Sequence, residues 1–387
     1  MLEFPMTAAL DCPQPHVRNW HADRALSQAA GSALKTRPDY RHHDVALEHL
    51  DALSPVLTNG YYNHAPMVVE ALSAMGQGRE ALAWLDREQD SFTPVDARTG
   101  PIDPDDWREL IAARGRYADW RAYFQDALET QPWREVAAIW VNRLTFGFSS
   151  SAAHGVLQTA HAVRALQSDA TPARLRALAN ALAGWASRHS SLPIKDQPNQ
   201  GVLDFQAALS RIQPLSDKHA PGEGAITAGY AQLVHAPGFA EEVSLVDLSG
   251  DLDARFDALM AVMAKLFLSL ARTPYTVIVF THAVTGTAAA RTLSQIVPDA
   301  VGRQLLFRAF EHGAALKTAF TPLALQSEAP RKPLPPGDPA RRAARHGDDH
   351  MIKLTEAVLD AYRRTHNPVF LDVIAQAFAV LPEPDAR

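Results

Sequence analysis

Two residues that could do chemistry stand three positions apart near the C-terminal end of the sequence. The segment GDDHMIKLTEAVLDAY (347–362) is typical of a helix start, because Asp348 or Asp349 can cap its first turn. Next come His350 and Lys353. A cation is unfavourable near the positive end of a helix, and Lys353 also borders the apolar stripe. Both effects favour the neutral amine, which can react with carbon dioxide to give a metal-binding carbamate.

Four further histidines stand where an imidazole could have a special role. His282 interrupts the apolar run VIVFTHAVTGTAAA, where a buried ring needs either a backbone hydrogen bond or a metal ion. His154 and His161 lie seven residues apart in one expected helix, so they share a face that lines either a crevice or a site. His64 follows YYN, and a histidine in such a setting is more often a core residue than a ligand. The residues alone leave these alternatives open.

Composition and motifs exclude several classes of function. The 387 residues carry a net charge of −6 and one cysteine, so no disulfide can form within the chain and no basic excess favours nucleic acid. We expect a cytoplasmic protein without a membrane span, because the start lacks the features of a signal peptide and the apolar run 275–290 is too short. There is no G-x-S-x-G nucleophile motif and no glycine-rich phosphate or dinucleotide loop.

The elements that must position these histidines are expected to be helices. Apolar residues recur at helical spacing over much of the chain, including 45–90, 105–129, 133–167, 171–189, 252–270 and 302–321. The segment YTVIVF (275–280) is either a strand or a buried helix. We predict a predominantly α or all-α protein with a single domain spanning 1–387. Its irregular parts are a loosely structured segment at 1–40 and a Pro- and Arg-rich loop at 327–346.

Four segments occur in an order and with a spacing that resemble the questin oxidase-like family. They are TNGYYNHAPMVVEALSAMG, SSSAAHGVLQTAHAVRAL, FTHAVTGTAAARTLSQIVP and GDDHMIKLTEAVLDAY, and the resemblance spans roughly residues 40–380. The family includes fungal enzymes that open anthraquinone rings by oxidation, together with many bacterial proteins of unassigned role. The resemblance implies a largely helical fold that holds a mononuclear non-haem iron.

The resemblance also implies which residues bind the iron. In the characterised type of site the ligands are four histidines and a carboxylated lysine, and the matching motifs place them at His64, His154, His282, His350 and Lys353. The sequence departs from the fungal pattern at Gln158, where those enzymes often have a second histidine. His161 follows one turn later. It is therefore a candidate catalytic residue that could be a further ligand, a partner of a ligand or a substrate contact.

The implied ligands indicate what the site would do. Imidazoles and an anionic oxygen suit Fe(II), so the leading hypothesis is an oxygenase that uses dioxygen to oxidise or cleave an aromatic, quinoid or polyketide-like small molecule. A second hypothesis is a Baeyer–Villiger-type oxidation with NADPH, which would act through a partner reductase or a non-standard site. A third is a non-catalytic helical protein that binds a metal or a small molecule. A two-metal hydrolytic site is the fourth.

Other residues near the histidines in the sequence could support the site. Carboxylates often orient metal-bound imidazoles, and the candidates are Asp348, Asp349 and Glu70. Several aromatic residues could either wall a pocket for a flat substrate or belong to the core: Tyr61, Tyr62, Phe146, Phe148 and Phe280.

Overall fold

The computed structural model describes residue 31, residues 37–327 and residues 337–383. Within these ranges the chain folds into helices, and its β pairing is limited to three isolated bridges. The prediction of an all-α domain is therefore confirmed. The predicted loose segment at 1–40 lies almost entirely outside the described residues. Among the described helices, none has the length and apolar content that a bilayer span requires.

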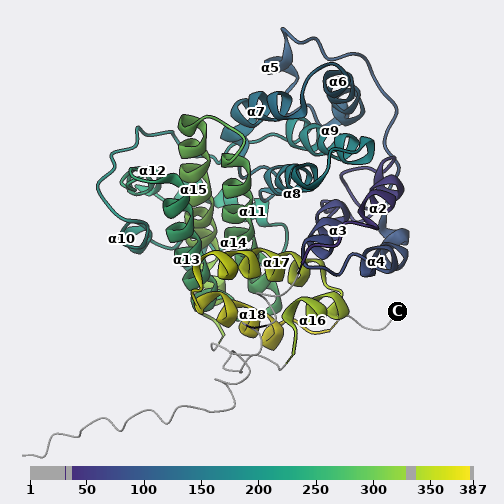
Figure 1. Ribbon diagram of the computed structural model, residues 1–387. Helices are drawn as coiled ribbons and strands as arrows, with labels where there is room; N and C mark the ends of the chain where they lie inside the picture. Colours follow the sequence, from purple (N-terminus) through teal and green to yellow (C-terminus); the bar gives the residue numbers. More distant parts are fainter. Residues whose placement is uncertain (1–30, 32–36, 328–336, 384–387) are drawn as a thin grey trace, which may run out of the picture.

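Helix α14 (Pro274–Ser294) runs through the middle of the molecule (Figure 1). Four helices pack against it: α8 (His154–Ser168), α13 (Leu252–Leu270), α15 (Asp299–Ala324) and α17 (Asp349–Thr365). Because these helices cover much of α14, 14 of its 21 residues are buried. This central position brings residues of α14 close to the ends of helices that are distant in the sequence.

The first turn of α14 explains why the segment YTVIVF is a helix and not a strand. The Thr273 side chain accepts a hydrogen bond from the Thr276 backbone N–H, and the Thr276 hydroxyl oxygen accepts one from the Thr273 N–H. Pro274 follows the cap at the first helical position, where its missing N–H costs nothing. This start signal and burial by neighbouring helices outweigh the strand preference of the β-branched residues.

A second group of helices covers the side of α8 that faces away from α13. In Figure 1 the purple and blue helices of this group surround α8 and α9 (Pro172–Ser187). The start of α9 is as predicted, because the Thr171 side chain accepts a hydrogen bond from the Arg174 N–H and Pro172 follows it. The other helices here are α2 (His43–Leu50), α3 (Ala65–Ala74), α4 (Glu80–Glu88), α5 (Trp107–Leu110), α6 (Tyr117–Thr130) and α7 (Trp133–Leu144).

The predicted loop at 327–346 is wrong in its second half, because Pro339–His346 is helix α16. Asp338 caps this helix through the Ala340 N–H, and Pro339 is its first residue. Its arginines face outward while Ala340 and Ala343 are buried, so the basic composition concealed a short amphipathic helix. Helix α18 (Val369–Val380) then packs on α17 and α13.

The region 190–250 is irregular and holds three short α-helices: α10 (Phe205–Arg211), α11 (Ile226–Ala231) and α12 (Phe239–Ser244). One backbone contact ties this region to α15. Pro322 lies inside α15 and has no N–H, and the carbonyl of Thr318, four residues earlier, accepts a hydrogen bond from the Leu215 N–H instead.

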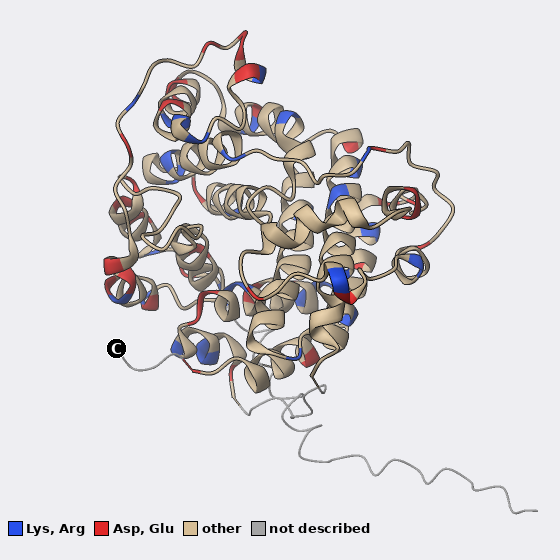
Figure 2. Cartoon of the chain, turned by 180° about the vertical axis from the view of Figure 1, so that it is seen from behind, with Lys and Arg blue, Asp and Glu red and all other residues tan. Residues whose placement is uncertain are grey.

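Charged residues lie mainly on the outer helices. In Figure 2, Lys and Arg are interspersed with Asp and Glu around the periphery, while the inner helices are mostly tan. The buried exceptions include Glu70, Lys353 and Glu356. Burying a charge is costly unless it is paired, so these residues need a specific explanation.

Candidate metal centre

Four histidines that lie in three helices and just before a fourth form a closed group of rings. His64 precedes α3, His154 begins α8, His282 lies in the middle of α14 and His350 lies in the first turn of α17. Successive ring centroids are 4.6 Å apart for His64 and His154, 5.0 Å for His154 and His282, 5.4 Å for His282 and His350, and 4.8 Å for His350 and His64. We call this group the four-histidine cluster.

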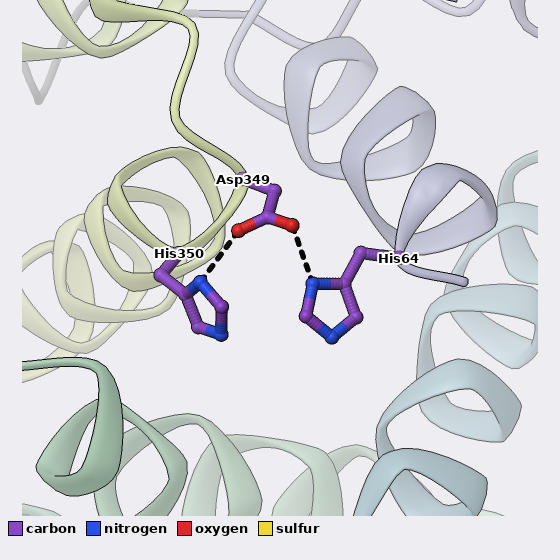
Figure 3. A group of neighbouring side chains, drawn as sticks. All are labelled: His64, Asp349 and His350. Carbon is purple, nitrogen blue, oxygen red and sulfur yellow. Dashed lines mark hydrogen bonds and ion pairs between the residues drawn. The ribbon is translucent and has the colours of Figure 1, made fainter. Parts of the chain in front are cut away.

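Each ring of the four-histidine cluster turns its Nδ1 atom outward to an oxygen acceptor. The Nδ1 atoms of His64 and His350 each lie 2.5 Å from one oxygen of the Asp349 carboxylate (Figure 3). The His282 Nδ1 lies 2.8 Å from the carbonyl oxygen of Ile278, and the His154 Nδ1 contacts the carbonyl oxygen of Ser151.

These contacts determine where the protons lie. A carbonyl or an ionised carboxylate can only accept, so each Nδ1 must carry the hydrogen. Burial acts to raise the pKa of Asp349, but the neighbouring His350 and His64 rings hold it well below its usual value, so the carboxylate is ionised. In a neutral ring the other nitrogen, Nε2, then has a free lone pair.

The free Nε2 atoms face one another inside the cluster. The His64 and His154 Nε2 atoms are 2.6 Å apart, and those of His154 and His282 are 3.4 Å apart. Two lone pairs at such distances repel unless they share a cation. A proton is disfavoured, because burial lowers the pKa of His64 to about 4 and holds those of His154 and His282 well below the usual value.

A metal ion would remove this repulsion. Two nitrogen ligands of one ion lie roughly 3.0–3.4 Å apart when each bond is about 2.1 Å. The two distances between Nε2 atoms bracket this range. The donor atoms and their outward hydrogen bonds therefore fit a metal ion, since metal-bound histidines almost always donate their other N–H to a carboxylate or carbonyl.

Lys353 adds a buried amine to the same region. Its side chain is 2% exposed, and its Nζ atom has no hydrogen-bond partner within the described residues. Burial lowers the pKa of this amine to about 8. Its charge also contributes, after burial, to the low pKa values of several rings of the four-histidine cluster, so the amine is close to them. An amine buried without a partner fits a group that is modified or bound to a metal.

Asp349 orients two histidines and is itself a poor candidate for the main ligand. His64, Asp349 and His350 could be taken as a three-residue metal group, because all three offer donor atoms close together. However, the carboxylate oxygens lie only 2.5 Å from the two Nδ1 atoms, and no ion fits between atoms at that distance. In Figure 3 the Nε2 atoms of both rings point away from the carboxylate. The neighbouring Asp348 caps α17 instead, accepting from the Met351 N–H.

A strained turn positions His154. Three consecutive residues before α8 have left-handed backbones: Ser151 (φ 48°), Ala152 (φ 60°) and Ala153 (φ 66°). Non-glycine residues pay about 1–2 kcal/mol each for this conformation. The turn directs the Ser151 carbonyl onto the His154 Nδ1 and thereby sets the direction of Nε2. Gly155 follows, where a Cβ would lie 2.6 Å from the Trp185 side chain.

The sequence as a whole matches a known family over the region that contains all of these residues. The model of the questin oxidase-like family matches residues 40–358. The chain belongs to the questin oxidase-like family. The resemblance seen in the four motifs is thus confirmed, and the family name indicates an oxidoreductase. No curated protein matches the sequence.

In this questin oxidase-like protein, the structure brings together four of the predicted ligands and places Lys353 beside them. His161 is elsewhere on α8, where its Nδ1 lies 2.6 Å from a carboxylate oxygen of Glu70. Gln158 does not take a ring's place, because its side-chain oxygen accepts from the Tyr62 hydroxyl. The predicted supporting role of Glu70 therefore concerns His161 rather than the four-histidine cluster.

The five aromatic residues proposed for a pocket have different surroundings. The Tyr62 ring stacks on His154, with centroids 4.8 Å apart. Phe148 packs near His312, and Phe280 is fully buried in the core. Tyr61 is exposed, and so is Phe146, which lies beneath the Arg308 guanidinium. Of these five residues, the structure thus places Tyr62 directly against a ring of the cluster.

Sequence reasoning missed two groups of residues in this region. The backbone carbonyls of Ser151 and Ile278 left no signal, because any residue type can supply a carbonyl. Arg164 and Glu356 form a partly buried ion pair with an N–O distance of 2.6 Å. The sequence could have indicated these two residues. Arg164 is three residues after His161, and Glu356 is three residues after Lys353, so each shares a helix face with a candidate site residue.

Proposed function

We propose that this protein is a non-haem iron-dependent oxygenase that acts on an aromatic or quinoid small molecule. The reaction would be an oxidative ring cleavage or a Baeyer–Villiger-type oxidation with dioxygen. The observation that carries this proposal is the convergence of unprotonated Nε2 atoms in the four-histidine cluster. Membership of the questin oxidase-like family supports the class of reaction.

The residues that would hold the iron are His64, His154, His282, His350 and a carboxylated Lys353. Bound Fe(II) would supply the redox chemistry that dioxygen requires. The protein itself fixes the direction of each imidazole by a hydrogen bond to Nδ1, and Asp349 does so for two rings at once. Imidazole nitrogens with one anionic oxygen form a ligand set that suits Fe(II).

Carboxylation of Lys353 would explain a cation at the N-terminus of a helix. The lone pair of the neutral amine would form a bond to the carbon of carbon dioxide, while one C–O π bond breaks and its electron pair moves onto oxygen. The nitrogen then gives a proton to water. The product is an anion, which the partial positive charge of the α17 N-terminus stabilises. Since burial lowers the pKa of Lys353 to about 8, roughly a tenth of this amine is neutral and reactive at pH 7, far more than of an ordinary lysine.

His161 is proposed as a catalytic residue outside the ligand set. Glu70 holds the proton on the His161 Nδ1, and burial together with nearby positive charge lowers the pKa of the ring. The free Nε2 can therefore accept a proton or a hydrogen bond. His161 and Lys353 line the same small cavity, so a group held there would lie within reach of the imidazole.

Metal analysis of the purified protein tests this function. The protein should be prepared without an affinity tag or chelator and measured by inductively coupled plasma analysis beside His350→Ala. We expect about one iron per chain in the wild type and a loss of iron in the variant. His49→Ala, which changes an exposed histidine in α2, is the control and should keep its iron. Protein without iron that also takes up none from anaerobic Fe(II) would contradict the proposal.

A further inference from the structure

A partly buried arginine, Arg164, whose side chain is 26% exposed, is shared by two carboxylates near Lys353. The Arg164 Nε lies 2.8 Å from one oxygen of Glu70, and its Nη1 lies 2.6 Å from an oxygen of Glu356. The carboxylates come from α3 and α17, and both are almost fully buried. One guanidinium can balance only one negative charge, so this arrangement holds one more carboxylate than a structural ion pair needs.

The two carboxylates have unequal surroundings, which decides which of them carries a proton. Glu70 accepts hydrogen bonds from Tyr40 and His161 as well as from Arg164, and its pKa is held well below the usual value although burial acts to raise it. For Glu356 the structure gives Arg164 as the hydrogen-bond donor. Burial, with the charges of Glu70 and Asp360, raises the pKa of Glu356 to about 7 against the opposing effect of Arg164.

Glu356 also lines a cavity whose walls include Lys353, a proposed ligand, and the partly exposed Asp360. The cavity has a volume of about 30 Å³, which is room for roughly two waters. His161 and Lys353 line it, and so does Asp360, whose side chain is 48% exposed. Lys353, Glu356 and Asp360 are three and four residues apart on α17, so they follow one face of the helix outward. The opposite wall is formed by small residues of α14, including Thr285, Ala289 and Thr292.

We propose that Glu356 is a proton-relay residue that carries protons between solvent near Asp360 and the end of this cavity lined by His161 and Lys353. In the transfer, the O–H bond of Glu356 breaks and an O–H bond forms on a cavity water. Glu356 then regains a proton from water at the Asp360 end of the cavity. No group is oxidised or reduced in this transfer. That the metal centre uses these protons rests on the proposed oxygenase function.

The titratable groups that face Glu356 come from every helix around the cavity. They are Arg164 and His161 on α8, Glu70 on α3, and Lys353 and Asp360 on α17; α14 contributes the hydroxyls of Thr285 and Thr292. The cluster of Glu311 and Arg308 on α15 gives an internal comparison. Glu311 is also a buried carboxylate with a raised pKa and is held by an arginine, but it does not line this cavity.

Infrared spectroscopy of the purified protein tests the relay without an activity assay. At slightly acid pH we expect the wild type to show a carbonyl band from the protonated Glu356 carboxylic acid, and we expect this band to be missing from the spectrum of Glu356→Gln. The glutamine keeps an oxygen that can accept from Arg164. Glu311→Gln is the matched control and should leave this band in place. A spectrum that Glu356→Gln does not change at any pH would overturn the proposal, because Glu356 would then carry no proton.

Transfer into deuterium oxide tests the path. In the wild type the band should shift to its deuterated position as fast as the solutions mix, whereas Ala289→Leu should slow the shift by about tenfold or more by filling the cavity. Thr292→Val is a milder second variant in case the larger residue disturbs folding. Equal exchange rates in all three proteins would overturn the path through the cavity.

The iron content of the same samples separates the two proposals. If the protein contains iron but shows no infrared band from a protonated Glu356, the relay proposal is contradicted and the oxygenase proposal stands. Iron absent with the Glu356 band present would contradict the oxygenase and support the buried acid.

Discussion

The four-histidine cluster and the buried His312 differ in what surrounds their rings. In the four-histidine cluster each Nδ1 faces a carbonyl or carboxylate oxygen, and the Nε2 atoms of His64 and His282 both face that of His154. His312 in α15 is equally buried, but its Nδ1 lies 3.0 Å from the Ser149 hydroxyl and 3.4 Å from that of Tyr230. Its Nε2 has no hydrogen-bond partner among the described residues and faces no second imidazole nitrogen within hydrogen-bond distance.

The comparison shows that burial alone does not mark a metal site. Burial lowers the pKa of His312 to about 3 and keeps that ring neutral, as it does in the cluster. What distinguishes the cluster is that acceptors fix the tautomer of every ring and leave several lone pairs directed at one point. The predictions below test this distinction.

The largest expected effect comes from removing one imidazole from each group. His282→Ala should abolish iron binding, because it removes a converging nitrogen and its backbone hydrogen bond. His312→Ala should keep one iron per chain and lose about 2–4 kcal/mol of stability, since it leaves a cavity and two hydroxyls without their partner. Iron content and urea unfolding would measure both. If His312→Ala lost its iron as completely as His282→Ala, the distinction between the groups would fail.

Neighbouring aspartates separate the orientation of ligands from the stability of a helix. Asp349→Ala removes the acceptor for two rings and should weaken iron binding by roughly 10–100-fold. Asp348→Ala removes the cap of α17 and should cost about 1 kcal/mol of stability with the iron affinity unchanged. Titration of the metal-free proteins with Fe(II) under anaerobic conditions would compare the affinities. Equal affinities for both variants would show that Asp349 does not orient the rings.

Acid should destabilise the protein through histidines that are buried without a metal role. His43 is 1% exposed, and burial lowers its pKa from 6.5 to about 4. The unfolded chain therefore binds this proton at a higher pH than the folded chain. The contribution to stability is complete above pH 6.5 and is lost as the pH falls toward 4, with a total of up to about 3 kcal/mol.

His43→Asn, which cannot take up a proton, should therefore show a weaker loss of stability over this range. Urea unfolding at several pH values between 7 and 4 would measure the slope for the variant and the wild type. Identical slopes would mean that His43 is protonated equally easily in the folded and unfolded chains.

The smallest expected effect concerns the strained turn before His154. Ser151→Gly should raise stability by up to about 1 kcal/mol, because glycine adopts the left-handed backbone without the Cβ penalty. Ser210→Gly, at an exposed helical position in α10, should lower stability by a similar amount and is the control. A stability loss in both variants would argue that the turn at Ser151 is not strained.

Much of the fold followed from local signals that have a direct physical basis. Thr171 and Pro172 are a typical helix start at the beginning of α9, and Gly76, which has a left-handed backbone, is a typical residue just after the end of α3. The sequence could not decide the structure of YTVIVF, because a helix buried on nearly all sides has no polar face to reveal its period. The sequence also did not predict the eight-residue helix α16, because its arginines and the prolines around it are typical of a loop.

For the site, the sequence indicated residue types but not contacts. Asp348 and Asp349 were equivalent candidates for a cap, and only the three-dimensional arrangement shows that one caps the helix while the other bridges two rings. Glu70 and His161 are 91 residues apart, so their pairing depends on how α3 packs against α8. The acceptors supplied by backbone carbonyls are invisible in any sequence.

Anomalous diffraction at the iron edge, from crystals of the protein loaded with Fe(II), would test the central claim most directly. The account predicts one strong peak within bonding distance of the Nε2 atoms of His64, His154, His282 and His350, with density for a modified Lys353 beside it. The absence of a peak there, or a peak bound through the Asp349 carboxylate with the Nε2 atoms left free, would contradict it.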